Sequence, residues 1–348
     1  MNSSSPRISV IVPTYNSAKY IEAAIDSMLS QRLAPAEIIV SDDGSCDDTL
    51  KILEAMQVGS VVPIHVHANP SPSGITNNYL HAAALVSSAD LIAVADHDDV
   101  WLPDRLSVIA AAFAESSDTM VVCCDSILTD QDLNSTGKTS RGGRRRSLSL
   151  CRRLAGRDSL AVYLRGGLPW AAHALSFRSS LLPLIMRRPP HIPDWYFEEF
   201  VVAVGAVSGR VLYIPEALTL YRQHAGQTTK KPIAPAPIAQ AGTVMDAFCD
   251  LNQQRIEKIR HCRSLLQEQQ VVPGTEADAR RRKRLQICEE ALDYCRSRKA
   301  LHVPPASLSQ FSRQYLRLVH RGYYVSYGRG VQSMAADLMR YLRVRWQH

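Results

Sequence analysis

The sequence contains no long apolar run. No stretch reaches the roughly 18 consecutive apolar residues that a membrane-spanning helix needs, and the segment MNSSSPRISV has no apolar signal region before the first predicted strand. Charged residues are also few, at 21% of the chain against 46% hydrophobic residues, as is typical of a globular protein. These features predict a cytoplasmic protein. At 348 residues the chain exceeds one comfortable core, so we expect two structural units.

Several cofactor and disulfide motifs are missing as well. The eight cysteines form no CxxC pair and no Cys/His zinc spacing, and only Cys123 and Cys124 are adjacent, so reduced thiols are expected. No Gly-rich phosphate loop with a lysine follows the first apolar run, and no DxDxT motif appears. These absences argue against a sugar-nucleotidyltransferase or a phosphohydrolase.

Positive charge is scarce in the first two thirds of the chain. Residues 1–226 contain 19 Lys and Arg against 23 Asp and Glu, a net charge of −4, whereas the part from Gln227 onward contains 21 against 10, a net charge of +11. The segment PIAPAPIAQ is typical of a linker, and helical spacing returns after it. We predict a first domain over 1–226, a linker over 227–242 and a basic helical region over 243–348.

Short β-branched apolar runs alternate with helical spacing in the first domain. Strands are predicted at 8–14, 37–43, 63–69, 91–96 and 119–125. Such alternation predicts an α/β fold with a mostly parallel sheet flanked by helices, whose ligand crevice lies at the carboxyl ends of the strands. The polar stretch 126–158, rich in Gly, Ser and Arg, is predicted to be one long loop.

Three aspartates crowd the end of one predicted strand, in the sequence ADHDDVW. Like charges a few ångströms apart raise one another's pKa, so a fold tolerates such a cluster mainly when a cation or a proton neutralises it. Asp96 and Asp98 can reach a common Mg²⁺ or Mn²⁺ through a local turn. The alternative is a cap for the helix that begins near Pro103, a role that Asp99 can fill.

Four segments carry a resemblance to a known family. In order along the chain they are ISVIVPTYN, IIVSDDGSCDDT, IAVADHDDVWLPDRL and VLYIPEALTLYRQH. Together they resemble the family 2 glycosyltransferases of the GT-A fold, and the DHDDVWLPDRL form is closest to rhamnosyltransferase-like bacterial members that assemble cell-surface polysaccharide. The resemblance covers about residues 8–226, and the tail carries none of it. It implies a Rossmann-like GT-A domain, here followed by a C-terminal helical extension.

The resemblance also implies a donor site. Asp96 and Asp98 match the DXD motif that binds Mn²⁺ or Mg²⁺ and the donor, His224 matches a third metal or diphosphate contact, and Arg222 lies nearby to neutralise phosphate. The remaining positions implied to form the nucleotide pocket are Pro13, Thr14, Tyr15, Asp42 and Asp43. A carboxylate that accepts the N3–H of uracil or thymine suits a UDP- or dTDP-linked donor. From the residues alone, Asp42-Asp43-Gly44-Ser45 is equally a strand-end turn, and a lone histidine is more often structural.

An inverting transfer needs a base that takes the acceptor hydroxyl proton. Family members usually carry an Asp about eleven residues before the Gly that precedes the last strand, and counting back from Gly209 reaches Glu198. The chain departs from the family there, since it offers Glu198, Glu199 and Asp194. We rank them in that order. The alternative for each is a helix-start charge favoured by the helix dipole.

Four further residues are candidate substrate contacts: Asp99, Trp101, His173 and Trp170. The last two lie where similar enzymes line the acceptor side, although a Trp near a strand is as often part of the core. The run Arg144–Arg146 is either a clamp for an anionic acceptor or a solvated loop.

We therefore predict a metal-dependent inverting glycosyltransferase acting on a glycan or lipid-linked glycan acceptor. The alternatives are a non-catalytic partner that binds nucleotide sugars and a metal-dependent sugar-nucleotidyltransferase. The basic, Leu- and Tyr-containing tail either contacts the anionic inner face of the membrane or packs as a helical subdomain, against the catalytic domain or a second copy in a homo-oligomer. No nucleic-acid-binding module is recognisable.

Overall fold

The computed structural model describes residues 5–142, 148, 151, 156–164, 171–192, 195–227, 244–301, 308–321, 334 and 337–339. Two compact units divide the chain, one from residues 1–157, 169–190 and 195–227, and the other from 158–168, 191–194 and 228–348. Most of the predicted linker, 228–242, lies outside the described residues. The predicted domain boundaries stay a prediction.

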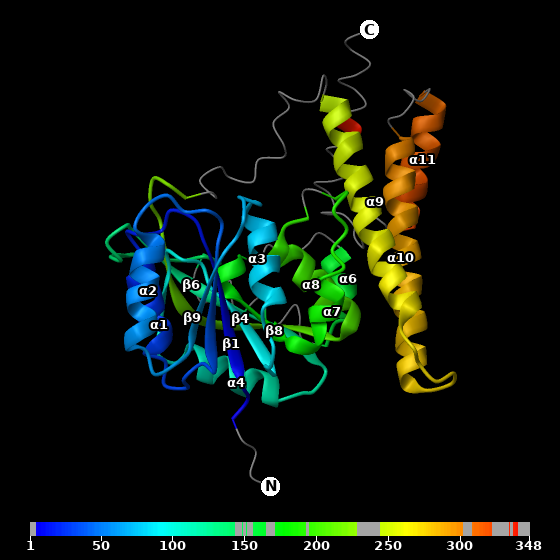
Figure 1. Ribbon diagram of the computed structural model, residues 1–348. Helices are drawn as coiled ribbons and strands as arrows, with labels where there is room; N and C mark the ends of the chain where they lie inside the picture. Colours follow the sequence, from blue (N-terminus) through cyan, green and yellow to red (C-terminus); the bar gives the residue numbers. More distant parts are fainter. Residues whose placement is uncertain are drawn as a thin grey trace. The chain divides into compact units, whose positions relative to one another are not determined.

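The first unit is built on one mixed sheet (Figure 1). Its strands are β1 (Ile8–Thr14), β2 (Glu37–Asp42), β3 (Ile64–Ala68), β4 (Leu91–Val94), β5 (Val100–Trp101), β6 (Thr119–Thr129), β7 (Ser135–Thr139), β8 (Leu175–Arg178) and β9 (Arg210–Arg222). The order across the sheet is β3-β2-β1-β4-β8-β6-β9-β5, with β7 paired to β6. Pairs among β3, β2, β1 and β4 are parallel, as is β6 with β9, whereas β8 is antiparallel to both of its neighbours. The predicted GT-A-type α/β fold is confirmed.

Helices cover this sheet. They are α1 (Ile21–Leu29), α2 (Thr49–Gly59), α3 (Ile75–Ala84), α4 (Arg105–Ala114), α7 (Leu182–Ile185) and α8 (Phe197–Ser208). Alternate residues of β1, such as Val10 and Val12, pack in one cluster with Ile25 of α1 and Ile109 of α4, as the period of two along a strand requires. Helix α3 packs against β1 and β2, and α8 packs against β6 and β9. The predicted strands are confirmed to within a few residues at their ends.

One sequence prediction is wrong. The stretch 126–158 was expected to be a single loop, but β6 continues to Thr129 and pairs with β7 in a hairpin. Asp125 holds this hairpin, because its carboxylate accepts hydrogen bonds from Thr139 Oγ1 (2.9 Å) and Ser140 Oγ (2.6 Å). The polar composition of the hairpin concealed a strand that pairs on one side only. The run Arg144–Arg146 lies outside the described residues.

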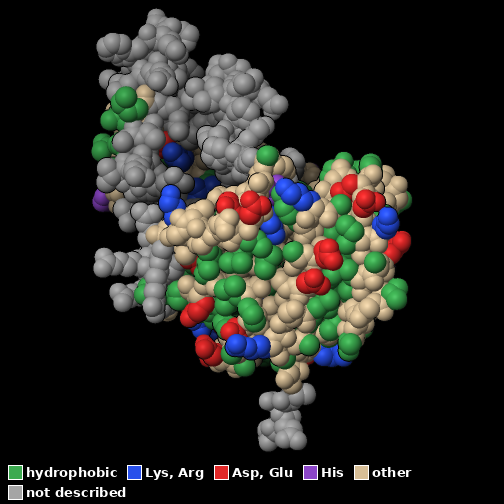
Figure 2. Space-filling model, turned by 90° about the vertical axis from the view of Figure 1, so that its left-hand side faces the viewer, with side chains coloured by type: hydrophobic (Ala, Val, Ile, Leu, Met, Phe, Trp, Pro, Cys, Tyr) green, Lys and Arg blue, Asp and Glu red, His purple; other side chains and the backbone are tan. Residues whose placement is uncertain are grey.

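The second unit is helical. It contains α6 (Ser159–Leu164), α9 (Val244–Glu268), α10 (Glu276–Ala300) and α11 (Leu308–His320), and α10 packs against the other three. The two long helices, α9 and α10, lie in the region 243–348 that was predicted to be helical. Thr275 caps α10, since its hydroxyl accepts the N–H of Asp278. Among the described helices, none is long and apolar enough to cross a membrane. On the face of the molecule shown in Figure 2, the described acidic and basic side chains are interspersed.

Candidate active site

The polar clusters after three strands lie at one edge of the sheet. Thr14 at the end of β1 pairs with Asp42 at the end of β2, and Ile11 of β1 pairs with Val94 at the end of β4. Because these strands are parallel, the loops that follow them all leave from the same edge. The fold thus brings together the PTY, DDGS and DHDD segments, as the strand pattern predicted.

Asp42 organises the loop after β2. Its side chain is fully buried, and it accepts hydrogen bonds from Thr14 Oγ1 (2.8 Å), Ser45 Oγ (2.5 Å), and the backbone N–H groups of Gly44 (3.1 Å) and Ser45 (2.8 Å). Gly44 has φ +87°, a conformation that favours glycine. These contacts match the strand-end turn that the sequence left open for Asp42.

Asp43 is differently placed. Its Oδ1 accepts from Asn69 Nδ2 (3.1 Å), Ser73 N (2.8 Å) and Ser73 Oγ (2.9 Å), and its Oδ2 accepts from Gly74 N (2.8 Å). Burial alone would raise the pKa of Asp43, but these hydrogen bonds together hold the pKa below its usual value. Asp43 is therefore ionised, and Oδ2 keeps a second lone pair for a ligand N–H.

The loop after β1 is tied to the loop after β2. Asn16, which sequence reasoning missed, has φ +48°; its N–H donates to Ser45 Oγ (2.8 Å) and its Oδ1 accepts the N–H of Cys46 (2.8 Å). Asn tolerates this conformation better than most residues, which is the signal the PTYN segment carried. Pro13 and Thr14 are buried, whereas Tyr15 is 52% exposed. Of these three, Tyr15 has the side chain most open to a ligand.

Asp98 and His224 form a pair. Asp98 Oδ2 and His224 Nε2 are 2.9 Å apart, and the His224 ring lies 4.7 Å from the ring of Tyr20. His224 Nδ1 accepts the N–H of Gly226 (3.2 Å), so the ring proton belongs on Nε2 in this state. The pair fits a divalent cation, because two neighbouring ligands of an ion with bonds of ~2.1 Å lie about 3 Å apart. Cation binding at Nε2 requires its proton to leave.

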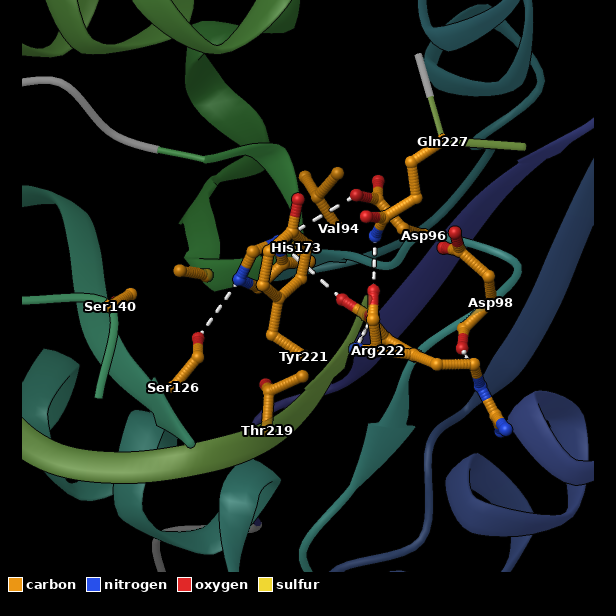
Figure 3. Close-up of polar contacts among 12 residues, drawn as sticks. Val94, Asp96, Asp98, Ser126, Ser140, His173, Thr219, Tyr221, Arg222 and Gln227 are labelled. Carbon is orange, nitrogen blue, oxygen red and sulfur yellow. Dashed lines mark hydrogen bonds and ion pairs between the residues drawn. The ribbon is translucent and has the colours of Figure 1, made fainter. Parts of the chain in front are cut away.

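Arg222 holds the aspartate loop. Its backbone N–H donates to Asp99 Oδ1 (2.9 Å), its Nε donates to the carbonyl of Asp98 (2.7 Å), and one of its terminal nitrogens donates to the carbonyl of Gln131 (2.5 Å). The side chain is 6% exposed, with its guanidinium 4.6 Å from the centre of the Tyr20 ring. Figure 3 shows the guanidinium directed at the Asp98 backbone. In this structure the guanidinium is thus bound to backbone carbonyls.

Asp96 and Asp99 converge on His173, and Figure 3 shows the Asp96 side chain directed at the His173 ring. Asp96 Oδ2 and Asp99 Oδ2 lie 3.6 Å and 3.5 Å from His173 Nδ1. Burial and the neighbouring Asp96 and Asp98 carboxylates raise the pKa of Asp99 well above its usual value. The pKa of Asp96 is lowered, because the contacts with His173 and Tyr79 outweigh the effect of burial. Two of the three predicted metal ligands, Asp98 and His224, therefore lie together. The third, Asp96, lies beside His173 instead.

Tyr79 connects Asp96 to helix α8. Its hydroxyl donates to Asp96 Oδ1, and its ring stacks on Phe197 with centres 4.8 Å apart and planes within 9°. Phe197 is the first residue of α8, and Glu198 follows it. Tyr79 was not singled out from the sequence, because only the fold brings α3 beside the start of α8.

Glu198 is a partly buried carboxyl group. Burial raises the pKa of Glu198 to about 7, and the charges of Asp96 and Glu199 add to that effect. A base with a pKa near neutrality is well matched to proton transfer at physiological pH. Glu199 is also half-buried in the first turn of α8, and Asp194 lies outside the described residues.

The predicted acceptor contacts are mostly inaccessible in this structure. His173 and Trp101 are 1% and 2% exposed, and the Trp101 ring packs against the Arg105 guanidinium at 4.1 Å. Arg105 is itself fully buried and donates to the carbonyl of Val94 (3.2 Å), so it places a positive charge beneath the aspartates. Trp170 lies outside the described residues.

Part of the sequence is similar to known glycosyltransferases. The profile of the family "Glycosyl transferase family 2" matches residues 9–163. An uncharacterized glycosyltransferase of Nostoc sp. is 27% identical over 224 residues, which are 63% of this chain and 65% of that protein. A GalNAc(5)-diNAcBac-PP-undecaprenol beta-1,3-glucosyltransferase of Campylobacter jejuni is 36% identical over 107 residues, 30% of this chain and 33% of that protein. The matches thus span less than two thirds of either relative.

Solved structures resemble the chain in fold. The crystal structure of S. aureus TarS 1–349 in complex with UDP-GlcNAc has a TM-score of 0.53 at 17% identity, covering 89% of this chain and 79% of that one. At this identity the likeness establishes the fold alone.

The raised pKa of Glu198 predicts a pH-dependent effect on stability. The ordinary pKa of 4.5 rises to about 7 in the folded state, so the folded state is penalised as pH rises from about 4.5 to 7, and the full penalty applies above 7. Glu198→Gln removes the charge. It should raise the free energy of unfolding by about 1–3 kcal/mol at pH 8 and have little effect at pH 4.5, as measured by urea unfolding without divalent cations. Glu54→Gln, which removes an exposed carboxylate of α2, is the control. An equal effect of Glu198→Gln at both pH values would contradict the buried carboxylate.

Proposed function

We propose that this chain, which carries a glycosyl transferase family 2 domain in residues 9–163, transfers a sugar from a nucleotide-diphosphate donor to a glycan or lipid-linked glycan with inversion at the anomeric carbon. We assign the donor to the UDP- or dTDP-linked class and the cation to Mn²⁺ or Mg²⁺. The product belongs to surface polysaccharide biosynthesis. The Asp98–His224 pair carries the proposal, because it offers an oxygen and a nitrogen ligand, 2.9 Å apart, beside the nucleotide loops.

The donor end of the reaction uses the loops after β1, β2 and β4. Asp43 accepts the base N–H through Oδ2, and Tyr15 contacts the nucleotide from the rim. Asp98 and His224 hold the cation, which when bound neutralises negative charge on the leaving diphosphate. Arg222 keeps the Asp98 loop in place through the Asp98 carbonyl (2.7 Å), so its contribution is to position Asp98.

The acceptor end uses Glu198. As the acceptor oxygen forms its bond to the anomeric carbon, the bond from that carbon to the diphosphate oxygen breaks, and the hydroxyl proton passes to the Glu198 carboxylate. A pKa of about 7 makes Glu198 a stronger base than an ordinary carboxylate while leaving much of it ionised at neutral pH. The Campylobacter jejuni relative is named for a lipid-linked acceptor, which supports the same acceptor class here.

The basic second unit fits a contact with an anionic membrane, where a lipid-linked acceptor would lie. On α11, Leu316 is 63% exposed and shares one helix face with the exposed Arg313, Arg317 and His320. Leu318 is 1% exposed and Leu338 is 41% exposed. If the tail packs as a helical subdomain, the side chains expected to pack form one apolar set: Leu316, Leu318, Tyr323, Tyr324, Leu338 and Leu342. Of the described members, Leu318 is buried and Leu316 and Leu338 are exposed. Tyr323, Tyr324 and Leu342, from the same set, lie outside the described residues. We propose the Leu316 face as the membrane contact.

The first functional prediction concerns the cation. Transfer should stop in excess EDTA and return with Mn²⁺, and Asp98→Ala should lower it about 10²-fold or more, because the diphosphate charge is no longer neutralised. The measurement is release of nucleoside diphosphate from a panel of nucleotide sugars, with and without acceptor. Glu54→Gln, which removes an exposed carboxylate of α2, is the control. Full activity of Asp98→Ala, or in EDTA, would refute the proposed site.

The second concerns the base. Glu198→Gln should lower the transfer rate by about 10²-fold or more and leave the dissociation constant of the donor nearly unchanged, because the base acts only in the chemical step. Glu199→Gln is the matched comparison, one residue along the same helix. Loss of transfer in Glu199→Gln with normal transfer in Glu198→Gln would assign the base to Glu199. Normal turnover in both variants would show that neither residue is the base.

The third concerns the membrane. The full chain should sediment with anionic vesicles and not with neutral ones, and the double change Arg313→Gln and Arg317→Gln should weaken that binding roughly 10- to 30-fold, at about 1 kcal/mol for each charge. Arg280→Gln with Lys283→Gln, on α10, removes the same charge elsewhere in the second unit. Equal sedimentation with both vesicle types, or equal loss in both double variants, would contradict a contact through α11.

A further inference from the structure

Three side chains beneath the aspartate loop share one arrangement. Asp96, Asp99 and His173 each have one polar atom held by an outer partner. Tyr79 Oη donates to Asp96 Oδ1, the backbone N–H of Arg222 donates to Asp99 Oδ1 (2.9 Å), and Ser126 Oγ lies 2.9 Å from His173 Nε2. The His173 ring is also stacked on Tyr221, with ring centres 4.5 Å apart. All three side chains are thus fixed in orientation.

The second polar atom of each side chain points to a common place. Asp96 Oδ2, Asp99 Oδ2 and His173 Nδ1 all lie within 4.8 Å of one another. Asp99 Oδ2 and His173 Nδ1 are buried and have no hydrogen-bond partner, although a buried polar atom normally has one. The arrangement of Asp99 Oδ2 and His173 Nδ1 around Asp96 Oδ2 therefore indicates that the three atoms share a ligand.

The distances fit a cation better than direct ion pairs. His173 Nδ1 lies 3.6 Å from Asp96 Oδ2 and 3.5 Å from Asp99 Oδ2, whereas a charged N–H···O hydrogen bond is about 2.7–2.9 Å long. Ligands bound ~2.1 Å from one tetrahedral ion lie about 3.4 Å apart. The outer partners match what metal ligands use, because a ligating imidazole usually hydrogen-bonds through its other nitrogen and a ligating carboxylate through its other oxygen.

We propose that Asp96, Asp99 and His173 form a second divalent-cation site, separate from the Asp98–His224 pair. One imidazole nitrogen and two carboxylate oxygens suit a transition-metal ion of the Zn²⁺ or Mn²⁺ class better than Mg²⁺, which prefers oxygen ligands throughout. The Asp96 side chain is 27% exposed while those of Asp99 and His173 are 0% and 2% exposed, so the ion enters past Asp96. The bound ion neutralises two of the three crowded aspartates without using the donor's cation.

The test is Zn²⁺ binding to the full chain without nucleotide. Equilibrium dialysis should find one tightly bound Zn²⁺ in His224→Ala, which lacks the other site, and none in His224→Ala with His173→Leu. Zn²⁺-soaked crystals should show an anomalous peak among Asp96, Asp99 and His173. Because His173→Leu can fail to fold, Ser126→Ala in the His224→Ala background is the second variant. It keeps all three ligands and should bind Zn²⁺ about 10- to 100-fold more weakly, since it loses only the outer partner.

Three results would overturn the proposal. The first is the absence of Zn²⁺ uptake by folded His224→Ala. The second is an anomalous peak only at other histidines. The third is ¹⁵N NMR that finds His173 doubly protonated at pH 7 in the presence of Zn²⁺, because a proton then neutralises the carboxylates in place of the ion. None of these depends on sugar transfer, so failure here leaves the proposed glycosyltransferase function intact.

Discussion

Compensation of three crowded carboxylates is the constraint on which the rest of the site depends. Asp96, Asp98 and Asp99 leave the sheet within four residues, and each finds a different partner: Tyr79 from α3, His224 beyond β9, and the Arg222 N–H at the end of β9. The loop after β4 is therefore held by partners from α3 and from the end of β9. Arg222 is the last residue of β9 and His224 follows two residues later, so the pairing of β9 with β6 and β5 brings both residues to the aspartate loop.

The contacts of Asp96 also link the proposed donor site with Glu198, the proposed base. Asp96 accepts the Tyr79 hydroxyl, the Tyr79 ring stacks on Phe197, and Glu198 is the next residue. The first two steps are direct side-chain contacts, and the last is the peptide bond between neighbouring residues. A change in the charge or position of Asp96 can therefore reach the first turn of α8 through one side chain. Tyr79 thus lies between the proposed donor and acceptor ends of the reaction.

Local sequence pattern was sufficient for the strands that lead into the site and insufficient for the side-chain partners within the site. The strands that end at Thr14, Asp42 and Val94 follow from short β-branched apolar runs, and their parallel order follows from the helical segments between them. The pairing of Asp98 with His224 and of Asp96 and Asp99 with His173 could not be predicted from this pattern, because both histidines are more than 70 residues away along the chain. The same is true of Arg222, whose charge suggested phosphate binding but whose donors meet the carbonyls of Asp98 and Gln131. Asn16 and Tyr79 were missed because their contacts are with segments distant in the sequence: Asn16 bonds to the loop after β2, and Tyr79 contacts Asp96 and Phe197.

Glu198 shows how magnitude decides between two roles for a charged residue. In the first turn of α8 the helix dipole favours a carboxylate by about 0.3–1 kcal/mol, which would lower its pKa. The rise from 4.5 to about 7 instead corresponds to roughly 3 kcal/mol in favour of the protonated form. Burial therefore outweighs the dipole, and a helix-start charge does not account for this residue. A carboxyl group kept partly out of water, beside Asp96, costs the fold stability at neutral pH, and that cost is the physical source of the basicity that the proposed proton abstraction requires.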